Sequence, residues 1–151
     1  MGINGINNRT NNFGNRVDGP WVFGMAEQGS RKVKMFLVEK RDRDTLLPLL
    51  LEHVDTQRVI VSDGWKAYCG LNLYFCGHNM VNHSENFIDP TTGCHTQLIE
   101  CVWSHAKLKI MANKRGTTIS LLQSHLSLFC FCYRFKGSEF EEFMRILDGK
   151  H

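Results

Sequence analysis

Two carboxylates in this sequence, Asp63 and Glu100, stand where side chains often do chemistry. The strand-forming run 59–61 leads to Asp63 and Gly64 then ends the strand, so Asp63 is expected at the C-terminal rim of a sheet. Glu100 falls within 97–113, where apolar residues recur every three or four positions, as on one face of a helix. Two or three carboxylates on such elements can hold a pair of magnesium ions for displacement at a phosphodiester.

Each carboxylate also has an ordinary structural interpretation. Asp is a favoured N-cap, so Asp63 could cap a short helix that begins at Gly64. Glu100, Trp103 and Lys107 lie at i, i+3 and i+7, so they share a helix face, which could simply be a solvated one. Spacing alone leaves both interpretations open.

The elements that must position these residues begin with two strands. The runs Trp21–Ala26 and Val33–Val38 predict an antiparallel hairpin. An amphipathic helix is predicted over 42–54, and the strand that ends at Asp63 follows it. The order hairpin, helix, strand predicts an α/β fold with a mixed sheet, a crossover helix and flanking helices.

Composition divides the whole chain into a lead, a core and a tail. Residues 1–20 are rich in Asn and Gly, so we expect a loop or disordered lead. The core is predicted over 21–136, and 137–151 is expected to form a C-terminal helix. Within the core, Thr96 is a candidate N-cap. Further predicted elements are short strands at Tyr74-Phe75 and Met80-Val81 and helices over 97–113, 118–135 and 138–147.

Composition bounds the class of protein. The 151 residues are 42% hydrophobic and 22% charged, which is ordinary for one globular domain with a core. The formal net charge of +3 is compatible with a polyanionic partner but is too small to indicate one. No apolar run is long enough for a membrane span or a signal peptide. We therefore expect an intracellular protein with no membrane partner, nuclear if the host is a eukaryote.

Six cysteines occur without a C-x-x-C pair. In an intracellular protein they are expected to be reduced, and buried free thiols are the favoured interpretation. The alternative is a small zinc site, for which the chain offers Cys76, His78, Cys94 and His95.

Several segments together resemble a known family. WVFGMAE, VIVSDGWKAY and VNHSENFIDPTTGCHTQLIECVWSHAK are similar to the DDE transposases of the insertion-sequence (ISXO-type) and Merlin group, and the resemblance runs from Trp21 to about Phe135. It implies an RNase H-like fold and a polynucleotidyl transferase that depends on Mg²⁺ or Mn²⁺, with two metal ions in an intact member. It also implies DNA as the partner, both transposon ends and target, and a possible homodimer.

The resemblance assigns roles to particular residues. The second and third catalytic carboxylates, which are metal ligands, fall on Asp63 and Glu100. Lys107 takes a position where related enzymes keep a basic residue that faces DNA. Further phosphate contacts are expected from the basic residues that follow it along the helix and its end, which are Lys109, Lys114 and Arg115.

Three further residues, His83, His95 and Trp103, are auxiliary candidates. His83 and His95 occupy positions where the family holds histidine, and each could position a water or a phosphate, or fix its loop through backbone carbonyls. Trp65 and Trp103 lie beside apolar stripes, which favours packing over base stacking.

The chain departs from the family at its start. The family keeps its first catalytic Asp on the first strand, in an I-D-E context upstream of W-V-F-G, but residues 1–4 here contain no acid. Asp18 lies in the loop leading into Trp21 and is a poor substitute. We therefore expect the first strand to be missing or degenerate, built at most from residues 2–8, as in a transposase remnant or a gene model that begins too late. Whether the chain is an enzyme stays open: it is either an inactive transposase catalytic domain or a degenerate or domesticated domain that binds DNA or protein.

Overall fold

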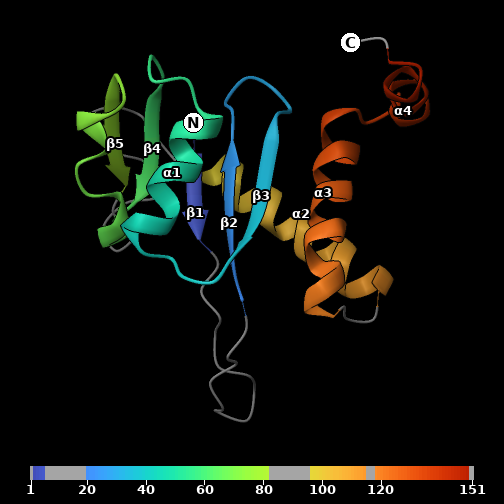
Figure 1. The fold of residues 1–151 in the computed structure, drawn as a ribbon, viewed down its shortest axis with the longest axis horizontal. Helices are drawn as coiled ribbons and strands as arrows, with labels where there is room; N and C mark the ends of the chain where they lie inside the picture. The colour runs from blue at the N-terminus through green and yellow to red at the C-terminus, as the bar shows by residue number, and fades with distance from the viewer. Residues whose placement is uncertain (1, 6–19, 82–95, 115–117, 150–151) are drawn as a thin grey trace.

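The computed structural model describes residues 2–5, 20–81, 96–114 and 118–149, with backbone only for 2–5 and 111–114. Its centre is a five-stranded sheet in the order β3-β2-β1-β4-β5 (Figure 1). The strands are β1 (Gly2–Gly5), β2 (Trp21–Ala26), β3 (Val33–Val38), β4 (Val59–Asp63) and β5 (Gly77–Val81). The helices are α1 (Arg43–His53), α2 (Gln97–Lys114), α3 (Ile119–Arg134) and α4 (Glu139–Leu147), with 3-10 turns at Lys66–Tyr68 and Leu71–Leu73.

Strand β1 is the middle strand of this sheet. Ile3 pairs with Met25 of the antiparallel strand β2 and with Ser62 of the parallel strand β4. The alternative of a missing first strand is therefore ruled out, whereas the alternative of a strand built from residues 2–8 agrees with β1, so residues 2–5 of the predicted lead belong to the sheet. The strand forms because β2 and β4 both offer it backbone hydrogen bonds, although Gly and Asn are poor strand formers. The predicted mixed sheet with a crossover helix between β3 and β4 is confirmed.

One face of the sheet is covered by α1, which lies in front of the strands in Figure 1. Asp42 caps this helix, because its Oδ1 accepts a hydrogen bond of 3.0 Å from the Thr45 backbone N–H. Leu46 and Leu50, one turn apart, are buried against the strands, whereas Leu51 is exposed. The leucine run therefore contributes one stripe to the core.

The other face is covered by α2 and α3. Of the apolar stripe predicted on 97–113, Ile99, Val102 and Ala106 are buried and Ile110 is partly buried. Trp103 joins them, in agreement with its predicted packing role. These residues pack with side chains of β2, β3 and α3, namely Val22, Ala26, Val33, Met35, Leu126 and Phe129.

Gly24 of β2 lets α2 approach the sheet closely. A Cβ atom at Gly24 would lie 2.6 Å from Cζ2 of the Trp103 indole, well inside van der Waals contact. The indole therefore occupies the volume that a side chain at position 24 would fill. This contact holds the first half of α2 over β1 and β2.

The prediction of a strand at Tyr74-Phe75 is wrong. The 3-10 turn Leu71–Leu73 precedes this pair, and the backbone N–H groups of Tyr74 and Phe75 both donate to the Leu71 carbonyl at 3.0 Å. The aromatic character of the pair serves packing instead, since Phe75 is buried with the α1 face. The companion prediction at Met80-Val81 is confirmed as part of β5.

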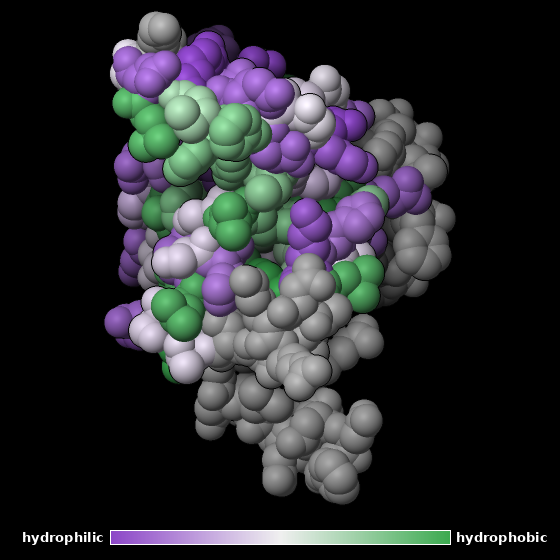
Figure 2. All heavy atoms as spheres, turned by 90° about the vertical axis from the view of Figure 1, so that its right-hand side faces the viewer, coloured by the Kyte–Doolittle hydropathy of each residue, from purple (hydrophilic) through white to green (hydrophobic). Residues whose placement is uncertain are grey.

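Helix α4 buries none of its residues. Its first turn is acidic, and its apolar residues lie on one side, with Phe140 72% and Leu147 65% exposed. Figure 2, which looks onto the side of the molecule that carries α3 and α4, shows hydrophobic residues open to solvent among hydrophilic ones. None of the described helices is long and apolar enough to cross a membrane.

Candidate active site

The candidate site lies where β1 and β4 end, at the lower edge of the sheet in Figure 1. Asp63 is the last residue of β4 and is half-buried. Ile3 pairs with Ser62, so the parallel register brings the next residue of β1, Asn4, level with Asp63. On its other side Asn4 pairs with Gly24 of β2. Position 4 therefore lies between Asp63 and the residue over which α2 packs.

Asp63 shapes the chain directly after its strand. Its Oδ1 accepts a hydrogen bond of 3.2 Å from the backbone N–H of Trp65. The 3-10 turn that follows begins after Trp65, which acts as its N-cap without a side-chain bond. The helix-cap interpretation of Asp63 is therefore wrong in its strict form, because the carboxylate holds the preceding turn.

A crevice of about 10 Å³ beside Asp63 is lined by Trp21, Arg41, Trp65 and Tyr68, among others. Burial raises the pKa of the Tyr68 hydroxyl, the negative charge of Asp63 raises it further, and Arg41 opposes both effects. Tyr68 is therefore a neutral phenol at physiological pH.

Ser62 and His78 support the end of β4 from within. The Ser62 hydroxyl is fully buried, donates to the Asp63 carbonyl at 2.9 Å and lies 2.7 Å from Nε2 of His78. The imidazole tautomer of His78 decides which of the two groups donates in this bond. Burial lowers the pKa of His78, which favours the neutral imidazole.

Glu100 lies in the first turn of α2, three residues before Trp103. Its carboxylate Oε1 accepts a hydrogen bond of 2.7 Å from the buried Thr96 hydroxyl, and its backbone N–H donates to the Thr96 carbonyl at 3.1 Å. Thr96 thus orients the carboxylate, a role that its prediction as an N-cap did not include. Because α2 packs on β1 and β2, Glu100 belongs to the helix that covers Asn4's strand.

The predicted DNA contacts are only partly within the described residues. Lys107 and Lys109 are exposed on α2. Hydrogen bonds from the backbone N–H groups of Glu139 and Gly137 lower the pKa of the Glu139 carboxyl, and the charge of Lys109 adds to this effect. The side chains of Lys114 and Arg115, and all of His83 and His95, lie outside the described residues.

The described residues do not complete a metal site. Among 2–5, 20–81, 96–114 and 118–149, no three His, Cys, Asp or Glu side chains are grouped closely enough to hold a metal ion. A two-metal site needs two or three shared carboxylates, and the position level with Asp63 on the neighbouring strand is Asn4. The arrangement therefore departs from the metal site that the resemblance implies.

The zinc alternative also loses part of its support. Cys76 is exposed, while His78 is engaged with Ser62, and Cys94 and His95 lie outside the described residues. The five cysteines that the structure describes are free thiols. The expectation that they are buried is wrong for Cys69, Cys76 and Cys101, which are exposed.

Sequence reasoning did not identify Arg41, a cation that lies at this edge of the sheet. Its guanidinium carbon lies 4.2 Å from the ring centroid of Trp21 and 3.6 Å from that of Trp65. Trp65 is 39% exposed, so the predicted packing role accounts for only part of its surface. No spacing in the sequence links these three residues, which come from β2, from the loop before α1 and from the turn after β4.

The mixed five-stranded sheet with helices packed on both faces defines the fold class of this chain. Among solved structures, the catalytic core domain of BIV integrase aligns over 99% of this chain and 95% of its own, with a TM-score of 0.58 and 14% identity. This likeness confirms the predicted RNase H-like fold.

The sequence pattern of the ISXO2-like transposase domain matches residues 3–133, so the chain belongs to this transposase family. The predicted membership of the DDE transposases is thereby confirmed. A comparison with curated proteins gives no match.

Proposed function

We propose that this chain is a DDE-type transposase core that binds DNA at the edge formed by β1, β4 and α2, and that it does not cleave the strand because Asn4 stands in place of the first carboxylate. The observation that carries the proposal is the register of β1. It brings position 4 level with Asp63 and beside Gly24, under the helix that bears Glu100. Family members keep an aspartate on this strand.

The chemical consequence follows from the donor types. Mg²⁺ or Mn²⁺, bound in pairs in an intact member, would activate the attacking oxygen and stabilise the leaving one. An Asn side chain is neutral, so exchanging Asp for Asn removes one negative charge from a hard-cation site. With Asp63 and Glu100 alone, this chain is expected to hold a divalent ion loosely, if the two carboxylates share one.

The DNA contacts proposed for this core lie on α2. Lys107 and Lys109 are exposed about two to two and a half turns beyond Glu100 and would contact phosphates, with Lys114 and Arg115 continuing the series. Such contacts release counterions, so affinity should fall as salt is raised. Affinity that is unchanged between low and physiological salt would contradict this part of the proposal.

The proposal is tested by restoring the acid. Asn4→Asp should raise the affinity for Mn²⁺, measured by calorimetry, and produce Mg²⁺-dependent nicking of a labelled oligonucleotide that the unmodified chain does not show. Adding Glu100→Gln should abolish that gain. Asn72→Asp, the same exchange at an exposed residue of a 3-10 turn, is the matched control and should change neither readout.

Two outcomes would overturn the proposal. Metal-dependent cleavage by the unmodified chain that requires Asp63 would show that another acid, with Asp18 the first suspect, supplies the third ligand. A lack of any change in metal affinity on Asn4→Asp would instead favour the second candidate, a degenerate or domesticated domain that binds DNA or protein without catalysis.

We also propose that self-association, if it occurs, uses α4. Its exposed apolar residues include Phe140, Phe143 and Leu147, at i, i+3 and i+7. Sedimentation velocity of the chain with and without Phe143→Ser measures this directly, and a dimer unaffected by that exchange would place the contact elsewhere.

A further inference from the structure

A stack of one cation and two indoles lies beside the candidate site. The Arg41 guanidinium lies between the rings of Trp21 and Trp65, and the Trp65 indole Nε1–H donates to the Arg41 carbonyl at 3.0 Å. The Trp65 backbone N–H in turn donates to Asp63. We call Trp21, Arg41 and Trp65 the indole platform. Hydrogen bonds through both the backbone and the side chain of Trp65 fix the platform relative to the carboxylate edge.

An open hollow of about 500 Å³ adjoins the indole platform. All three platform residues line it, and all three also line the crevice that holds Asp63. Its charged lining residues are the cations Lys40, Arg41, Arg43 and Lys66 and the anions Glu39 and Asp42. Four cations against two anions give this hollow a net positive charge.

Some of these charges already serve the fold. Asp42 caps α1 through two bonds to Thr45, of 3.0 and 2.7 Å, which lower the pKa of its carboxyl. Arg43 donates to the Cys69 carbonyl at 2.7 Å and ties the rim to the segment after β4. Lys40 and Lys66 are exposed and line the hollow, so both can reach an anion placed in it.

The chemistry selects a ligand that is both anionic and aromatic. Lysine ammonium groups on an open surface favour phosphates. The indole of Trp65, with 39% of the residue exposed, offers a stacking surface of the kind that binds bases. Bases inside a duplex are already stacked on each other, so an exposed indole is used best by an unpaired strand.

We propose that the indole platform and its hollow bind an unpaired DNA strand, with a base stacked on Trp65 and the adjacent phosphates held by Lys40 and Lys66. The strand would then lead directly to Asp63, since the platform and the carboxylate share one crevice. This inference rests on DNA as the substrate in the proposed function. It adds a surface separate from the lysines of α2.

The first experiment measures fluorescence anisotropy of short labelled oligonucleotides, single-stranded and duplex. Lys40→Glu/Lys66→Glu should weaken single-strand binding by about tenfold or more, because phosphate contacts are lost and two negative charges are added. Arg31→Glu/Lys136→Glu is the matched control, since it makes the same change in charge at two exposed residues remote from the hollow. It should weaken binding by less than about threefold, through the general field alone.

The second experiment uses the indole itself. Single-stranded oligonucleotide should quench the tryptophan fluorescence of the unmodified chain, and Trp65→Phe should remove most of the quenching. Trp103 is buried, so it should contribute little to the quenching. Equal thermal melting curves of the variants would establish that the differences do not come from unfolding.

The outcomes separate this inference from the proposed function. If Lys107→Glu/Lys109→Glu weakens binding but Lys40→Glu/Lys66→Glu does no more than its control, the indole platform is not a strand site and the proposed function stands. Preference for duplex over single strand, with quenching unchanged in Trp65→Phe, would likewise overturn the inference alone. If neither the unmodified chain nor any variant binds DNA at low salt, the proposed function fails as well.

Discussion

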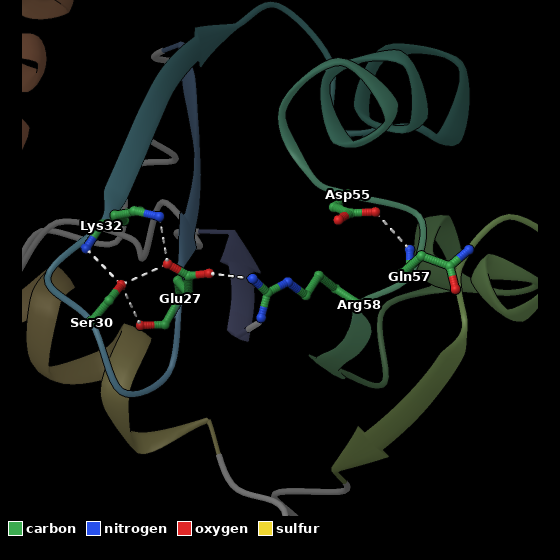
Figure 3. A network of polar contacts seen from close by, with 6 residues as sticks. All are labelled: Glu27, Ser30, Lys32, Asp55, Gln57 and Arg58. Carbon is green, nitrogen blue, oxygen red and sulfur yellow. Dashed lines mark hydrogen bonds and ion pairs between the residues drawn. The ribbon is translucent and has the colours of Figure 1, made fainter. Parts of the chain in front are cut away.

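The two ends of the sheet both carry charged residues around a hollow, but they use their charges differently. At the upper end in Figure 1, Glu27 accepts from Ser30 at 2.8 Å and pairs with Lys32 and Arg58, each at 3.3 Å. Figure 3 shows these side chains converging on Glu27, with Asp55 nearby bonded to the Gln57 backbone. The ion pairs tie the turn after β2 to the start of β4.

At the lower end, Arg41 stacks on two indoles and Asp63 accepts a backbone N–H. The upper hollow, of about 390 Å³, is not much smaller than the lower one, of about 500 Å³. In the upper hollow, which has three lysine and arginine side chains against two carboxylates, one carboxylate bridges two of the cations, whereas the lower one keeps an exposed indole and has four cations against two anions. The comparison teaches that how charges are partnered, and not the size of a hollow, marks the end that can bind a polyanion.

Gly24→Ala is expected to have the largest effect on stability, because it should move α2 away from the lower end of the sheet. The new Cβ would meet the Trp103 ring at 2.6 Å, so the helix must shift, at a cost of about 1–3 kcal/mol measured by urea unfolding. Gly64→Ala is the control at the same end, because only a Met80 sulfur at 3.9 Å would be near. Adding Trp103→Phe to Gly24→Ala should recover part of the loss, and a strictly additive pair would contradict the proposed clash.

Ser62→Ala should have the next largest effect, because it leaves the partly buried Nε2 of His78 without its hydrogen-bond partner. We expect a loss of about 1–3 kcal/mol in the free energy of unfolding. Ser104→Ala removes an exposed hydroxyl that donates to the Glu100 carbonyl and should cost much less. Equal losses in the two variants would show that the bond between Ser62 and His78 contributes little.

His78 should make the lower end the first to weaken in acid. Its folded pKa is below 6.5, so the unfolded state binds more protons between the folded pKa and 6.5. Stability is therefore complete above about pH 6.5 and falls as the pH is lowered through that window. Unfolding at a series of pH values should show the decline, and His78→Gln should flatten it. A decline that persists in His78→Gln would assign it to another group.

Glu27→Gln should produce the smallest effect, at the upper end. The pairs are solvent-exposed, so the loss at neutral pH is expected to be at most about 1 kcal/mol and to shrink in high salt. The bond from Ser30 and the contact with Lys32 lower the pKa of Glu27 below 4.5, so this contribution is present above pH 4.5 and lost as the pH falls through the folded pKa. Glu39→Gln, another exposed carboxylate, is the control. If the contribution of Glu27 to stability is lost at a higher pH than that of His78, the proposed order of the two losses in acid is wrong.

Local pattern was enough for much of the fold. The helix predicted over 42–54 agrees with α1 because Asp42 is a strong cap and the leucines repeat with the helical period. The helices over 118–135 and 138–147 agree with α3 and α4, although neither Thr118 nor Ser138 makes a side-chain cap bond. Asp63 was placed correctly at a strand end, since valine and isoleucine followed by glycine are a local signal.

Local pattern failed where a segment has no preference of its own. The residues of β1, Gly-Ile-Asn-Gly, are mostly poor strand formers, and the strand exists because β2 and β4 supply hydrogen bonds on both sides. Tyr74-Phe75 has the opposite property, with strand-forming residues that lie after a 3-10 turn. Partners distant in the sequence override propensity in β1, whereas the local bonds to the Leu71 carbonyl override it at Tyr74-Phe75.

The sequence by itself determined the family, the types of the catalytic candidates Asp63 and Glu100, and the lack of an acid among the first residues. Only the tertiary structure decided that Asn4 stands level with Asp63 and that Arg41 lies between Trp21 and Trp65. Strand register is set by backbone pairing between segments far apart in the chain, and no spacing within either segment encodes it. The stack likewise forms where a loop, a strand and a turn meet, because the sheet brings their ends to one edge.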